Sequence, residues 1–147
     1  MAEPGIDPQA VDPAEFAKTI GSTPDEQLAA GMRSDFREQV LGEIFRRMEE
    51  HVDAERARGV EAVIHFHITG GPDDSVDEWE AVIENGACKV SDEPSRSPRV
   101  TLKMDGVDFL KLVSGNVGGP KLFMTGRLKI EGDLMFAASA AGLFRIP

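Results

Sequence analysis

The spacing of apolar residues changes near residue 60, and this change restricts the chain to folds that combine helices with strands. From Ser34 or Asp35 to Val52, apolar side chains recur every three to four residues, which predicts one amphipathic helix of about 20 residues. From residue 61 onwards, apolar and polar side chains alternate, which predicts strands with one apolar face. An α+β protein is therefore expected.

Five strands are expected from this alternation. They lie at residues 61–68, 78–84, 87–90, 99–104 and 127–130. Asn85 and Gly86 form a two-residue hairpin signal between the second strand and the third. Because each strand has one apolar and one charged face, the expected fold is a five-stranded, mostly antiparallel (mixed) sheet with helices packed on one face.

Two short helices are expected on either side of a glycine-rich break. Residues 105–113 carry an apolar helical pattern, Gly115–Gly119 interrupts it, and residues 121–125 continue it. Leu122, Phe123 and Met124 are consecutive, so on a helix they point in different directions and cannot all face one sheet. Either one of them is exposed or a second apolar surface, such as a ligand cavity, lies beside them.

Helix starts are marked by side chains that can cap the first turn. Asp12 and Pro13 are typical of a helix start after a flexible arm at residues 1–12. Thr23 is expected to be the N-cap of a second helix, and Asp133 the N-cap of a last, Ala-rich helix. The Arg and Glu residues of the long helix are assigned to its solvated face.

Charge and composition exclude several classes of protein. The net charge of −10 argues against a nucleic-acid partner, since phosphate contacts require clustered Lys and Arg. Residues 1–85 carry −13 and residues 86–147 carry +3. The basic half either approaches an anionic bilayer transiently or is ordinary surface scatter. One cysteine, no signal peptide and no long apolar run together predict a cytoplasmic protein.

Few residues point to catalysis or metal binding. His65 and His67 share one strand face, as metal ligands or as partners of Glu78 and Glu80, but no third His or Cys ligand recurs at a suitable spacing. The acidic stretch 73–78 lacks the features of an EF-hand loop, and the Gly115–Gly119 stretch is more typical of a hinge than of a phosphate loop. Cys88 is expected to be a small buried hydrophobe. We therefore expect no enzyme, no metal and no cofactor.

Residues 36–146 resemble the sterol carrier protein 2 (SCP2) family of lipid-binding domains. The resemblance depends on the order of elements, on Trp79 in the second strand, and on motifs at Pro98–Leu102, Asp105–Leu112 and Phe123–Asp133. It implies a domain at residues 36–147, preceded by an N-terminal helical extension at residues 1–35. The chain lacks a C-terminal Ser/Ala-Lys-Leu peroxisomal address, so it is expected to be a stand-alone, bacterial-like version.

The same resemblance implies a non-catalytic domain that binds and transfers an apolar lipid, namely a sterol, a fatty acid or a fatty acyl-CoA, in a hydrophobic tunnel between sheet and helices. The alternative is a protein-interaction or dimerisation module of the same fold without lipid, as in a homodimer. A small metalloprotein or hydrolase using the two histidines is a further alternative. The expected lipid-binding residues share an apolar side chain on the inner side of an element: Phe45, Met48, Phe66, Trp79, Leu102, Phe109, Leu110, Val113, Leu122, Phe123, Met124 and Phe136.

Overall fold

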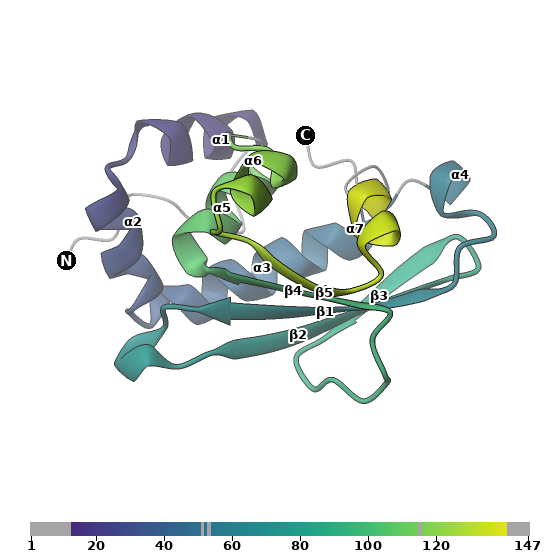
Figure 1. Cartoon of the computed structure of the whole chain (residues 1–147). Helices are drawn as coiled ribbons and strands as arrows, with labels where there is room; N and C mark the ends of the chain where they lie inside the picture. The colour runs from purple at the N-terminus through teal and green to yellow at the C-terminus, as the bar shows by residue number, and fades with distance from the viewer. Residues whose placement is uncertain (1–12, 51, 53, 115, 141–147) are drawn as a thin grey trace.

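A five-stranded mixed sheet forms the centre of the computed structural model, which describes residues 13–50, 52, 54–114 and 116–140 (Figure 1). The strand order is β3-β2-β1-β4-β5, and β1 and β4 pair in parallel while the other neighbours are antiparallel. The strands are β1 (Ala62–Thr69), β2 (Asp77–Glu84), β3 (Ala87–Ser91), β4 (Val100–Asp105) and β5 (Lys129–Gly132). The predicted fold class is confirmed. The predicted arm at residues 1–12 lies outside the described residues.

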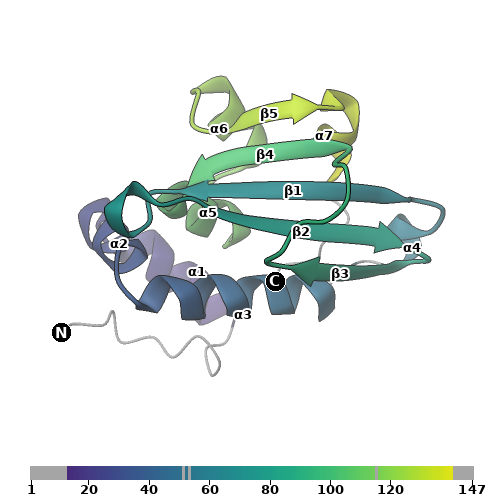
Figure 2. The same cartoon turned by 90° about the horizontal axis from the view of Figure 1, so that it is seen from below.

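Helices cover one face of this sheet, as Figures 1 and 2 show from two directions. The described helices are α1 (Pro13–Ser22), α2 (Asp25–Met32), α3 (Phe36–Glu50), α4 (Ala54–Ala57), α5 (Gly106–Val113), α6 (Gly119–Met124) and α7 (Leu134–Ala140), with a 3₁₀ turn η1 (Pro72–Asp74) before β2. From below, the strands lie in front of α5, while α3 runs along the β3 side of the sheet and α7 lies at the end of β5 (Figure 2). The core therefore lies between the sheet and this layer of helices.

The core follows the two apolar periods of the sequence. On β1, buried side chains alternate with half-buried ones, and the buried set is Ala62, Ile64, Phe66 and Ile68. On α3, the buried apolar side chains are Val40, Leu41, Phe45 and Met48. Ile20 of α1 and both Leu28 and Met32 of α2 belong to the same apolar cluster. The division of the chain at residue 35 into extension and domain stays a prediction.

A tight turn forms the β2–β3 hairpin, and hydrogen bonds to Glu80 hold the segment that leaves β3. Asn85 and Gly86 have φ of 55° and 76°, and two positive φ values are the requirement of a tight two-residue hairpin turn. After β3, the chain crosses the outer face of the sheet to reach β4 (Figure 2). The buried carboxylate of Glu80 accepts hydrogen bonds from the backbone N–H groups of Ser95 (3.1 Å) and Arg96 (2.9 Å). Glu80 therefore attaches this crossing segment to β2.

Two charged residues of α3 do not lie on its solvated face, so that prediction was wrong for them. Arg37 is only 3% exposed, and its guanidinium donates to the backbone carbonyls of Met32, Ile68 and Thr69. Glu43 is 8% exposed and is paired with Arg46 and Arg47 along the same helix. Helical spacing alone did not indicate that Arg37 is buried, because its guanidinium donates to the Ile68 and Thr69 carbonyls, about thirty residues away in sequence.

Two predicted boundaries also differ from the structure. Thr23 does not cap α2: its hydroxyl donates to the Thr19 carbonyl (2.6 Å), which closes α1, and Pro24 is the N-cap residue instead. The last strand begins at Lys129 rather than at Arg127. The N–H groups of Arg127 and Leu128 bond back to the Leu122 carbonyl, so both residues complete the end of α6.

Candidate functional site

Four of the predicted lipid-binding residues form one aromatic cluster between α3, α5 and the sheet. The Phe45 ring is stacked on Trp79 at 4.4 Å and lies 5.3 Å from Phe109. Phe66 meets Phe45 edge-on at 5.2 Å. Because Phe45, Phe66 and Phe109 are buried and Trp79 is half-buried, this cluster fixes α3 and α5 over the centre of the sheet.

Most of the other predicted residues extend the same apolar layer towards α6 and α7. The buried ones are Met48, Leu110, Val113, Leu122 and Phe136, and Leu102 is half-buried against them. Their lipid-binding role stays a prediction, although the structure brings them into one apolar cluster with Phe45, Phe66 and Phe109.

Phe123 and Met124 are the two predicted residues that the cluster does not contain. Phe123 is 46% exposed and Met124 is 84% exposed, whereas the preceding Leu122 is buried. The consecutive apolar residues of α6 therefore do point in different directions, and two of them face outwards.

The first turn of α7 repeats this arrangement, which sequence reasoning missed. Leu134 is 54% exposed and Met135 is 85% exposed, while Phe136 is buried. The same signal, three consecutive apolar residues at a helix end, was present there. Figure 2 shows α6 and α7 at the two ends of the edge strand β5, so the two exposed pairs lie along one edge of the sheet.

Hydrogen bonds and ion pairs hold both helices in place. Asp133 is the predicted N-cap of α7, and its carboxylate accepts from the Phe136 N–H at 2.9 Å. This bond and the Arg99 guanidinium hold the pKa of Asp133 below its usual range. At the other end of β5, the Arg127 guanidinium lies 3.1 Å from the buried carboxylate of Asp108 on α5. Burial and the nearby Asp105 nevertheless raise the pKa of Asp108.

The two histidines and the cysteine that sequence analysis considered are paired or buried. His65 and Glu80 lie 3.0 Å apart, and His67 and Glu78 lie 3.6 Å apart, which agrees with histidines paired to glutamates. Burial, and secondarily Glu49, raises the pKa of the Cys88 thiol to about 12. Among the described residues, we find no cluster of three His, Cys, Asp or Glu suited to a metal ion.

In the part of the chain that the structure describes, no helix combines the length and apolar character needed to cross a membrane.

The mixed sheet with helices on one face is the fold of the SCP2 class of proteins. Sterol Carrier Protein 2 from Yarrowia lipolytica, in its apo form, has a TM-score of 0.59 with 24% identity and covers 77% of this chain and 94% of its own. Palmitated SCP2L2 from Aedes aegypti has a TM-score of 0.53 with 23% identity, covering 67% of this chain and 88% of its own.

The chain belongs to the SCP-2 sterol transfer family, whose model matches residues 41–145. A curated relative, hydroxysteroid dehydrogenase-like protein 2 from Xenopus tropicalis, is 33% identical over 98 residues. That match covers 66% of this chain but only 23% of the relative. The chain thus spans about a quarter of the length of such relatives, which contain other regions besides this fold.

Proposed function

We propose that this protein binds one apolar lipid between the sheet and the helices α5, α6 and α7, without catalysing a reaction. Family membership supports lipid binding, and a structural neighbour was solved in a palmitated form. The ligand classes that fit the proposal are a sterol, a fatty acid and a fatty acyl-CoA.

One observation carries this proposal. Of the five large apolar side chains that are exposed among the described residues, four lie on α6 and α7: Phe123, Met124, Leu134 and Met135. Each pair is next in sequence to a buried residue of the predicted lining, Leu122 or Phe136. Apolar surface thus runs from the core to the outside at both helices, which is what a lipid tail would follow on entry.

Burial of a tail supplies the binding energy. Each methylene that leaves water gains about 0.8 kcal/mol, so an apolar lining is sufficient and no reactive group is needed. Methionine side chains adapt to irregular ligands, which suits Met124 and Met135 at an entrance. Release to a bilayer would follow transient contact of the β5 edge of the sheet with a membrane. The protein would act in the cytoplasm, and residues 1–35 would form an extension of the lipid-binding domain.

A direct binding assay tests the proposal. Titration of the full chain with a fluorescent fatty acid, followed by displacement with palmitate, cholesterol and palmitoyl-CoA, should show saturable one-to-one binding and rank the three classes. Failure of the probe and of all three competitors to bind would contradict the proposal.

The exposed residues also favour one alternative, a dimerisation module. In that case a second copy would cover Met124 and Met135, which are the most exposed of the set. Sedimentation velocity separates the two functions: a monomer that binds the fatty acid supports lipid carriage, and a dimer that refuses it supports the module.

A further inference from the structure

Three residues at the start of β2 have no strand partner on the side where β3 lies, at the opposite edge of the sheet from α6 and α7. β3 pairs only with residues Glu80–Glu84 and ends at Ser91, opposite Glu80. Asp77, Glu78 and Trp79 therefore have β1 on one side and no strand partner on the other. Glu84 and Ala87 flank the two-residue turn and therefore form a hydrogen-bonded pair. Every second residue back along β2 from Glu84 directs its backbone N–H and C=O to the same side, so those of Glu78 point towards the open edge.

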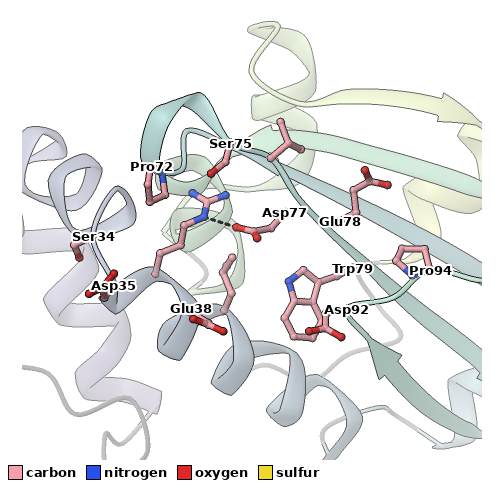
Figure 3. Close-up of a pocket in the computed structure, with 13 residues that line it drawn as sticks. Ser34, Asp35, Glu38, Pro72, Ser75, Asp77, Glu78, Trp79, Asp92 and Pro94 are labelled. Carbon is pink, nitrogen blue, oxygen red and sulfur yellow. Dashed lines mark hydrogen bonds and ion pairs between the residues drawn. The ribbon is translucent and has the colours of Figure 1, made fainter.

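A groove of about 640 Å³ lies along this open edge (Figure 3). Asp35 and the first turn of α3, with Glu38, form one wall, and the start of β2 forms the other. Asp92 and Pro94, which follow β3, lie at the end of the groove where Trp79 is found. Because the chain turns away after Ser91, the groove lies where a longer β3 would have continued.

The groove is strongly acidic, and its negative charge is not neutralised from within. Asp35, Glu38 and Asp92 are exposed and form no ion pair with any other residue in the described ranges. Arg37 is the one basic residue of the lining, but it is buried and bound to three carbonyls and to Asp77 at 2.5 Å. An occupant that brings cations would therefore find carboxylates with no competing partner.

We propose that this groove binds an extended, Lys- or Arg-bearing segment of a partner protein, which adds to β2 as a short strand beside residues 77–79. The open backbone groups of Glu78 would pair with the segment, as in other cases of strand addition. Its cationic side chains would lie against Asp35 and Glu38 on one side and Asp92 on the other. A polypeptide is favoured over a small amine, because a small amine could pair with the carboxylates but could not form strand hydrogen bonds with the backbone of Glu78.

The groove proposal does not require a bound lipid, so each proposal can fail alone. Trp79 is the single tryptophan of the chain and lines the groove, so its fluorescence reports occupancy. The Phe45 ring stacked on it at 4.4 Å fixes the indole in place. Because Trp79 also contacts Phe45 of the predicted lipid lining, variants of the groove carboxylates are needed to assign a change in emission to the groove.

The experiment titrates the full chain with a blocked six-residue peptide that alternates Arg and Thr. We expect a saturable change in Trp79 emission at low salt that weakens as salt is raised. The double variant Glu38→Gln, Asp92→Asn should weaken binding about tenfold. The matched double variant Glu61→Gln, Glu131→Gln makes the same charge change outside the groove and should weaken it less than about twofold.

Two further probes decide whether a strand is added. The same peptide, N-methylated at alternate backbone nitrogens, keeps its charge but cannot pair as a strand, and it should bind at least about tenfold more weakly. Equal binding of the N-methylated peptide, equal binding of spermine, or equal losses in the two double variants would each overturn the proposal. Loss of peptide binding as the chain self-associates at higher concentration would show that a second copy of the chain occupies the groove, and would overturn the proposal as well.

Discussion

The carboxylate of Asp133 lies 2.9 Å from Nε of Arg99, and this ion pair joins the residue before β4 to the N-cap of α7. The backbone N–H of Asp133 donates to the Arg99 carbonyl at 3.1 Å, and the Arg99 guanidinium lies 4.4 Å above the Phe136 ring. Gly132 precedes this junction with φ of 102°, where a Cβ would lie 2.5 Å from the Arg99 carbonyl oxygen. The position of α7, and with it of Leu134 and Met135, depends on these contacts.

Removal of the Asp133 side chain should therefore loosen α7. Asp133→Ala loses both the bond from the Phe136 N–H and the pair with Arg99, and we expect the melting temperature to fall by about 3 °C. Asp133→Asn keeps a capping oxygen and should recover most of that loss. Thermal unfolding followed by circular dichroism measures both, and an Asn variant as unstable as the Ala variant would show that the cap does not matter.

Glu80 should make stability depend on pH. Burial raises the pKa of its carboxyl, but the Arg96 N–H, His65 and the Ser95 N–H outweigh burial and hold the pKa below its ordinary value of 4.5. The unfolded chain then binds the proton more readily than the folded one, so this stability is complete above pH 4.5 and is lost as the pH falls through the folded-state pKa.

We therefore expect Glu80→Gln to lower the free energy of unfolding by about 2 kcal/mol at pH 7, since two backbone N–H groups lose a carboxylate acceptor. The difference from wild type should shrink below pH 4.5. Urea unfolding at pH 7 and at acidic pH gives both values. Glu61→Gln, an exposed change before β1, is the control. A difference that stays constant with pH would contradict this role for Glu80.

Cys88 should be inert in the folded protein. Its thiol is 5% exposed and its pKa is raised to about 12, so almost no thiolate is present at pH 8. Labelling with a chromogenic disulfide reagent should be negligible in buffer and complete in denaturant. Rapid labelling of the native protein at pH 8 would show that the strand opens more readily than its packing indicates.

Phe123 and Met124 should be replaceable without loss of the fold, because both are exposed. Phe123→Glu and Met124→Glu are expected to leave the melting temperature nearly unchanged and to lower affinity for a fluorescent fatty acid about tenfold each, since each places a charge on the path of the tail. Val76→Glu is a matched control, because Val76 is as exposed as Phe123, at 46%, but lies before β2. An equal loss in the control would remove the case for an entrance at α6.

Local chemistry predicted much of the fold, and contacts between distant residues account for what it missed. The alternation of β1, the Asn85-Gly86 turn and the Asp133 cap each depend on neighbours in sequence, and all three predictions were confirmed. Arg37 was assigned to solvent because its acceptors, Ile68 and Thr69, lie on another element. The late start of β5 has a similar origin, since Arg127 is held by α6 and by Asp108.

The candidate site was predictable to a smaller extent. The consecutive residues Leu122, Phe123 and Met124 predicted either one exposed side chain or a second apolar surface, and Phe123 and Met124 are exposed. The same pattern at Leu134–Phe136 was not used, so the exposure of Met135 was not predicted. The groove beside Trp79 could not be predicted, since it depends on where β3 ends relative to α3.

Native mass spectrometry of the purified full chain, followed by solvent extraction and lipid analysis, tests lipid carriage most directly. We predict a monomer with one adduct of lipid mass, which the extract identifies as a fatty acid, an acyl-CoA or a sterol. The folded Phe123→Glu, Met124→Glu double variant should have lost that adduct. A mass without adduct, in a protein that also refuses a fluorescent fatty acid and a sterol, would contradict the proposed function.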